Sequence, residues 1–320
     1  MLRKKAIRKA FITTMSLFII MTIYTIPIED RLNSKDVSLE IEYVTSLGNH
    51  SIYLLDKNNY LVKLKVLLDS NNLKDNIKAI ISYLTESNSL KYTDSLKPVI
   101  PVNTKLKNIT ISDKQVTLNF SKDILKVSSK LEKKMVESIV YSLTELDDID
   151  EVTIKVEDKT LDEYPNCKEK INYPLKRDFG INKSYQFTKT NNINKTVVYY
   201  LEEVNDNSYY VPVTSYTNDS RDKVDIIIEE LTTGYIYEPN LMSIVREDLT
   251  LLDKSINDQV MILNFNDALF DSSGKVKEEV LYTIGYSIFD NYDVNVISYR
   301  VNDKEVVNLQ SNYSDYSTQK

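Results

Sequence analysis

The pentapeptide Val-Thr-Leu-Asn-Phe at residues 116–120 recurs as Met-Ile-Leu-Asn-Phe at residues 261–265, and this recurrence decides the fold. The first stretch alternates apolar and polar side chains, which is the pattern of a half-buried β-strand, and the second has its residues at matching places, with the same Leu-Asn-Phe ending. Outward from them, residues 51–161 and 196–306 agree at a nearly constant offset of 145 to 149. A repeat of that length predicts a duplicated domain.

Each copy contains the same succession of elements around that strand. A tyrosine-bearing hairpin is predicted at residues 52–64 and again at 197–213, where polar turn residues separate two apolar runs. Two amphipathic helices follow in each copy, and a closing strand is predicted at residues 152–156 and 297–301. Helices of this length are marginal alone in water, so each must bury its apolar stripe against a sheet.

The predicted fold class is therefore α+β. We expect two tandem two-layer domains, each a small mixed β-sheet with two helices on one face, in the order β-β-α-β-β-α-β. The expected segments are a first domain at 40–161, a linker at 162–194, a second domain at 195–308 and a disordered tail at 309–320.

The N-terminus has the pattern of a membrane anchor. Residues 1–9 carry five basic residues and no acidic one, and residues 11–28 contain no charge. A helix over residues 10–28 is long enough to cross a bilayer, and the basic tail at 1–9 is expected in the cytoplasm, with the bulk of the chain extracytoplasmic. A cleaved signal peptide and a buried core helix are the alternatives, although no small-x-small cleavage site precedes Glu29.

Charge and cysteine content exclude several classes of protein. Residues 31–320 contain 35 basic and 45 acidic residues, a net charge of −10 that opposes binding to nucleic acid. The single cysteine, Cys167, excludes an intramolecular disulfide, and because it does not follow the apolar span it excludes a lipoprotein anchor.

Few residues suit catalysis. His50 is the only histidine in the sequence, and its position next to Gly48 and Asn49 predicts a solvated loop. A histidine-dependent triad or a site with several histidine ligands is therefore excluded. Cys167 lacks a plausible histidine partner, and we expect no catalytic, cofactor or metal site.

Acidic residues cluster where the second helix of each copy ends. The first cluster lacks the spacing and the turn glycine of a calcium loop, so it predicts a solvated loop, with cation binding as the alternative. Asp123 and Asp267 match between copies, and each is expected to cap a turn or the start of a helix. The clustered acids are Glu145, Asp147, Asp148, Asp150 and Glu151, with a weaker echo at Asp290 and Asp293.

Tyrosines near the two hairpins form the predicted interaction surface, because tyrosine is enriched at protein contacts. Core packing is the alternative role for about half of them. They are Tyr53, Tyr60, Tyr199, Tyr209 and Tyr210.

The order of elements resembles the GerM domain of sporulation and spore-germination proteins. Three features carry the resemblance: the hairpin running from Tyr199–Leu201 to Tyr210–Val213, the amphipathic helix, and the hairpin ending in Gln115–Ser121 before the second helix. The family often has a Gly-Pro after the first helix and an Ile-Pro before the middle strand. Here Ile100-Pro101 keeps the second feature only in the first copy, and Gly234 lies near the place of the first feature only in the second copy.

The resemblance implies a non-catalytic, membrane-anchored extracytoplasmic protein of a spore-forming bacterium, similar to ring-building domains of sporulation complexes. We expect it to bind protein partners in a cell-envelope complex during sporulation or germination. The alternative is a protein that binds or hydrolyses cell-wall polysaccharide, in which the tyrosines would stack on sugars.

Overall fold

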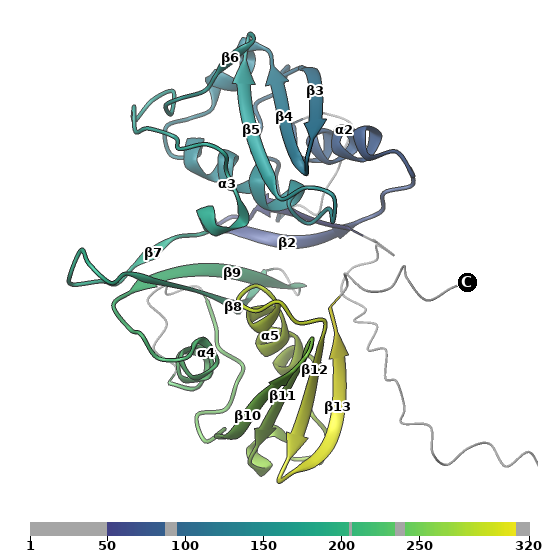
Figure 1. Ribbon diagram of the computed structural model, residues 1–320, viewed down its shortest axis with the longest axis vertical. Helices are drawn as coiled ribbons and strands as arrows, with labels where there is room; N and C mark the ends of the chain where they lie inside the picture. Colours follow the sequence, from purple (N-terminus) through teal and green to yellow (C-terminus); the bar gives the residue numbers. More distant parts are fainter. Residues whose placement is uncertain (1–49, 87–94, 205–206, 234–240, 312–320) are drawn as a thin grey trace, which may run out of the picture. The chain divides into compact units, whose positions relative to one another are not determined.

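A computed structural model describes residues 50–86, 95–204, 207–233 and 241–311 (Figure 1). The predicted cytoplasmic tail and membrane helix at residues 1–28 lie outside these ranges. Within the described ranges, no helix combines the length and apolar character needed to cross a membrane.

The first module contains two strands, a helix, two further strands, a helix and a final strand pair. Its elements are β1 (His50–Leu55), β2 (Leu61–Val66), α2 (Leu73–Leu84), β3 (Leu106–Ser112), β4 (Gln115–Phe120), the short 3₁₀ helix η1 (Lys122–Lys126), α3 (Glu132–Leu143), β5 (Glu151–Val156) and β6 (Lys159–Thr160).

The second module repeats this order with longer strands in its hairpin. Its elements are β8 (Asn194–Val204), β9 (Asn207–Thr217), α4 (Lys223–Thr232), β10 (Leu251–Asn257), β11 (Val260–Phe265), η3 (Asp267–Leu269), α5 (Glu278–Phe289), β12 (Val296–Val301) and β13 (Lys304–Gln310).

The prediction of tandem α+β modules is confirmed, but the prediction of one mixed sheet per module is wrong. In each module the first hairpin forms a separate sheet, and the remaining strands form a four-stranded sheet in the order β3-β4-β5-β6 or β10-β11-β12-β13. The central pair of each larger sheet is parallel, and its outer pairs are antiparallel. The predicted element order also omits the last strand of each module.

Helices separate the two sheets because they are apolar on more than one side. Helix α3 contacts β1 on one side and β5 on the other, and ten of its twelve residues are buried. Helix α5 contacts β8 in the same way. A helix covered on two sides gives each module three layers, and not the two layers that were predicted.

The repeated Leu-Asn-Phe motif has a structural explanation. Asn119 donates a hydrogen bond from Nδ2 to Oδ1 of Asp158 (2.7 Å) and accepts one from the Asp158 backbone N–H (3.0 Å). Asn264 makes the same pair with Asp303, at 2.7 and 2.9 Å. Both aspartates have positive φ in a tight turn, so the asparagine holds a strained turn that starts the last strand.

The segment between the modules, predicted to be a linker at 162–194, packs against both of them. It contains η2 (Arg177–Phe179) and β7 (Ser184–Tyr185), and β7 pairs in parallel with β9. Leu175 pairs with Val152 of β5, which extends the first four-stranded sheet beyond the short β6. Tyr164, Ile171 and Ile181 are also buried.

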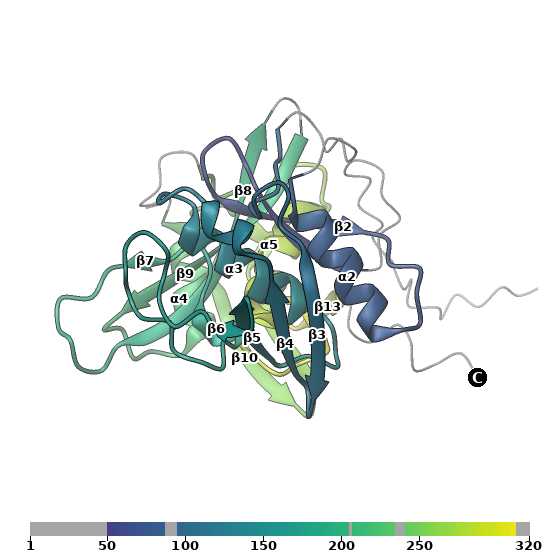
Figure 2. The same ribbon diagram turned by 90° about the horizontal axis from the view of Figure 1, so that it is seen from above.

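One continuous apolar core runs through both modules. Strand β2 contacts β9, so the two hairpins lie against each other where the modules meet (Figures 1 and 2). The second module also extends past its predicted end at 308, because Leu309 is buried in β13. Residues 312–320, most of the predicted disordered tail, lie outside the described ranges.

Candidate functional site

Several buried charged groups lie together where the two modules meet, and we call this region the junction. It comprises Tyr53 and Glu145 of the first module, Arg177 of the connecting segment, and Tyr199 and Asp290 of the second module. The Arg177 Nη2 atom lies 2.9 Å from Oε1 of Glu145 and 2.8 Å from Oδ1 of Asp290. One guanidinium therefore bridges carboxylates from both modules.

The two carboxylates occupy equivalent places in the repeat, 145 residues apart. The Tyr53 hydroxyl donates to Oε1 of Glu145 (2.6 Å), and the Tyr199 hydroxyl donates to Oδ2 of Asp290 (2.8 Å). A charge-assisted hydrogen bond of this kind is roughly twice as strong as a neutral one. Arg177 thus lies between two copies of the same tyrosine–acid pair.

Local structure places these tyrosines by the same device in each module. A serine hydroxyl on the second helix accepts a hydrogen bond from the tyrosine backbone N–H: Ser142 for Tyr53 at 3.0 Å, and Ser287 for Tyr199 at 2.9 Å. This hydrogen bond holds the hairpin strand against the second helix of its module. The tyrosine ring consequently points toward the end of that helix. The acid follows the helix by two residues in the first module and by one in the second.

The electrostatic state of Glu145 follows from its surroundings. Burial opposes its ionisation, but the charges of Lys63 and Arg177 and the Tyr53 hydroxyl together hold the pKa of Glu145 well below its usual range. The Lys63 Nζ atom lies 3.5 Å from Oε1 of Glu145. Glu145 is therefore an ionised, buried carboxylate at neutral pH.

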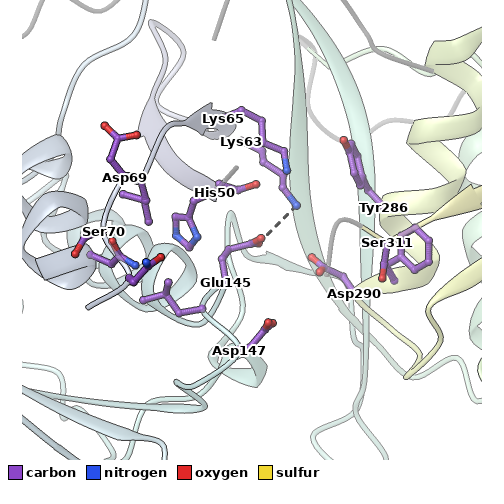
Figure 3. Close-up of a pocket in the computed structure, with 16 residues that line it drawn as sticks. His50, Lys63, Lys65, Asp69, Ser70, Glu145, Asp147, Tyr286, Asp290 and Ser311 are labelled. Atoms are coloured by element: carbon purple, nitrogen blue, oxygen red, sulfur yellow. Dashed lines mark ion pairs between the residues drawn. The ribbon is translucent and has the colours of Figure 1, made fainter. Parts of the chain in front are cut away.

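A cavity of about 290 Å³ opens beside the junction (Figure 3). It is bounded by the β1–β2 hairpin, the ends of α3 and α5, and Ser311. Burial and the charge of Lys63 lower the pKa of Lys65 to about 8. The Lys63 ammonium lies 4.8 Å from the centroid of the Tyr286 ring, a cation–π contact. The labelled lining residues are His50, Lys63, Lys65, Asp69, Ser70, Glu145, Asp147, Tyr286, Asp290 and Ser311.

Asn182 of the connecting segment provides a second, uncharged bridge between the modules. Its Nδ2 atom donates to the carbonyl of Leu61 in β2 and to that of Pro212 in β9, both at 2.8 Å. Its own backbone N–H donates to Oε2 of Glu137 in α3, at 3.0 Å. Asn182 therefore connects the segment to both modules, although it belongs to no sequence motif.

The prediction that His50 lies in a solvated loop is wrong. His50 begins β1, is 6% exposed, and has Nε2 3.0 Å from the carbonyl oxygen of Ser142. Burial lowers the pKa of His50 below its ordinary value of 6.5. It is a structural contact between the hairpin and α3.

The predicted tyrosine surface is mostly interior. Tyr53 and Tyr199 are fully buried, Tyr209 and Tyr210 are 5% and 9% exposed, and Tyr60 is half-buried. Buried rings cannot contact a partner from outside the chain. The tyrosines are buried because helices and the opposite hairpin cover both faces of these strands.

The structure also shows where the remaining candidate residues lie. Glu145 is buried, so the prediction of a solvated loop is wrong for this member of the acidic cluster. Asp123 and Asp267 lie in the first turns of η1 and η3, but the N-cap positions are Ser121 and Asn266, and neither short helix has a side-chain cap hydrogen bond. Cys167 is exposed, and its backbone N–H donates to Oε1 of Glu132 at 2.9 Å. Across the described ranges, no group of three histidine, cysteine, aspartate or glutamate side chains is placed to hold a metal ion.

Sequence reasoning missed Arg177, Asn182 and Lys63. The only available signal was that Glu145 and Asp290 stand at equivalent places in the repeat with a tyrosine equivalent in each copy. Nothing in the sequence connects residue 177 to either acid.

Comparison with known proteins identifies the repeat. The family described as "Germane: Sporulation and spore germination" matches residues 51–162 and 197–307. The spore germination protein GerM of Bacillus subtilis (strain 168) is 28% identical over 288 residues, which cover 86% of this chain and 78% of that protein.

A solved structure agrees with both modules at once. The tandem GerMN domains of the sporulation protein GerM from Bacillus subtilis superpose with a TM-score of 0.73 at 29% identity, covering 80% of this chain and 91% of that one. The duplicated architecture is therefore shared along with the fold of each module. This chain belongs to the sporulation and spore germination family and carries two tandem copies of its domain.

Proposed function

We propose that this chain is a non-catalytic, membrane-anchored extracytoplasmic protein that binds partner proteins in an envelope complex during sporulation or germination. Membership of a sporulation and germination family supports a role in sporulation or germination. The observation that carries the binding role is the junction. Its buried arginine and acidic residues bind one another and so connect the two modules, and they do not line a catalytic site.

A rigid pair of modules suits a binding protein because fixed surfaces lose little entropy when a partner binds. An N-terminal anchor would also confine the pair to the membrane surface, which raises its effective concentration toward a membrane-bound partner. The cationic residues 1–9 and the uncharged residues 11–28 support this anchor.

Strand β10 is the sheet edge that best suits a protein partner. It lies at one end of the second four-stranded sheet, where backbone groups can pair with an added strand. It exposes two large apolar side chains, Leu252 at 51% and Ile256 at 49%. The equivalent edge strand β3 exposes Lys107 and Thr110.

The test is crosslinking in sporulating cells with the full-length chain. The paired substitution Leu252→Lys and Ile256→Lys should abolish recovery of the partner, whereas Thr110→Lys on β3 should leave it unchanged. All variants must accumulate to equal amounts. If no protein crosslinks to the wild type, the binding role is refuted.

Membrane attachment needs its own measurement. The full-length chain should sediment with membranes and resist extraction by high salt, since an apolar span is not held by surface charge. Replacing residues 1–28 with a cleavable signal peptide should release it into the extracytoplasmic fluid. Release of the wild type by salt would refute the anchor.

One observation favours the alternative of a polysaccharide-binding protein. Tyr185 is 66% exposed, and its ring stacks on Tyr216 at 5.2 Å with Phe187 edge-on at 6.1 Å. Exposed aromatic rings of this kind can stack on sugars. Retention on purified peptidoglycan that is lost in Tyr185→Ala, but kept in the exposed control Leu67→Ala, would favour this alternative over protein binding.

A further inference from the structure

Two buried acids from different modules meet away from Arg177. Asp56 follows β1 in the first module and Glu202 lies in β8 of the second, and each residue is 1% exposed. Asn58, two residues after Asp56 in the β1–β2 turn, donates a side-chain hydrogen bond to Glu202, so the turn that carries Asp56 lies against Glu202, and the Asp56 carboxyl acts on it. No basic side chain forms an ion pair with either acid among the pairs found in the described ranges, unlike the acids bound to Arg177.

Each carboxyl group has one satisfied oxygen. Asp56 Oδ1 accepts the Tyr60 backbone N–H at 2.7 Å, and Glu202 Oε1 accepts a hydrogen bond from Nδ2 of Asn58. The other two oxygens, Oδ2 of Asp56 and Oε2 of Glu202, are buried and have no donor among the residues that the structure describes. One hydrogen atom shared between the two carboxyl groups would give both of these oxygens a partner.

We propose that Asp56 and Glu202 share a single proton. This proton links the β1–β2 turn of the first module to β8 of the second, so the contact between the modules is sensitive to alkaline pH. A carboxylic acid bound to a carboxylate satisfies both facing oxygens with one O–H donor. Ionising both groups would place two like charges together in a buried place.

The charged and titratable groups around Asp56 and Glu202 are consistent with a shared proton. The β1–β2 turn contributes Asp56 itself and the exposed Lys57, and β9 contributes Tyr209, the cross-strand neighbour of Glu202. Burial and the neighbouring Asp56 raise the pKa of Glu202 to about 8, which the charge of Lys57 only partly offsets.

The sign of the pH dependence follows from linkage. An unfolded glutamate loses its proton near pH 4.3, whereas the folded pair keeps it to about pH 8. The stability from the shared proton is therefore complete below about pH 4.3, declines as pH rises, and is lost once pH passes about 8. Between pH 6.5 and 8, the unfolding equilibrium constant should rise by roughly sixfold per pH unit from this proton, because the proton is progressively lost as the pH nears 8.

The test measures urea unfolding of the full-length chain between pH 6.5 and 8, and compares the wild type with Glu202→Gln so that the titration of His50, common to both, cancels. Glu202→Gln can donate its amide hydrogen to Asp56 at every pH, so this variant should lose the rise in the unfolding equilibrium constant. Glu247→Gln, an exposed control, should retain it. Carboxyl ¹³C resonances supply a second readout, in which one carboxyl group remains protonated at pH 7 in the wild type.

Two results would overturn the proposal. If wild type and Glu202→Gln show the same pH dependence and both carboxyl resonances are ionised at pH 7, no proton is shared. If calcium or magnesium chloride stabilises the wild type at pH 8 but not Glu202→Gln, a cation and not a proton bridges the two acids.

Discussion

Replacing Arg177 with alanine tests whether the junction holds the two modules together. Its guanidinium is the shared partner of Glu145 and Asp290, whose side chains are only 6% and 10% exposed. Removing one partner from a buried ion pair costs about 3 to 5 kcal/mol, because a charge is left buried without compensation. Glu145 keeps Lys63 at 3.5 Å, and Asp290 keeps the Tyr199 hydroxyl, so we expect the lower end, about 3 kcal/mol.

Urea unfolding of the full-length chain at pH 7, followed by circular dichroism, measures this change. The expected loss corresponds to roughly a 150-fold increase in the unfolding equilibrium constant. Arg246→Ala is the matched control, since Arg246 also binds a carboxylate with two nitrogens, but both partners are more than half exposed. Solvent screens an exposed pair, so this substitution should change stability far less than Arg177→Ala.

Neutralising the acids separates lost charge from lost packing. Combining Arg177→Ala with Glu145→Gln and Asp290→Asn removes the uncompensated charges, so part of the stability should return. A loss below about 1 kcal/mol in Arg177→Ala, equal to that of the Arg246→Ala control, would refute the view that the junction joins the modules.

Three further predictions concern single positions. His50 resists protonation because burial lowers its pKa, so the wild type should lose stability relative to His50→Gln as pH falls below about 6.5, which thermal melts between pH 5 and 7 would detect. Gly285→Ala should cost about 1 to 3 kcal/mol in urea unfolding, because the added Cβ would lie 2.2 Å from Cδ2 of Leu309, and Leu309→Ala in the same chain should recover part of it. Asn119→Ala and Asn264→Ala should each cost about 1 to 3 kcal/mol by leaving a strained turn without its two hydrogen bonds, and equal stability to wild type would contradict that role.

The sequence by itself determined the duplication and the type of most elements. Alternation of apolar and polar residues depends only on the geometry of a strand, and the helical stripes only on the helical repeat, so both can be read locally. The strands β6 and β13 were missed because edge strands expose their side chains; in β13 only Leu309 is buried. Residues 304–310 therefore lack the alternation of a half-buried strand.

Tertiary structure alone decided which residues are buried and which charges meet. Residues 145, 177 and 290 come from three separate parts of the chain, and no local pattern specifies that one arginine bridges two acids. The same holds for Asp56 and Glu202, and for the tyrosines that the sequence placed on a surface. Burial depends on what covers a strand from the other side, and that covering element lies far away in sequence.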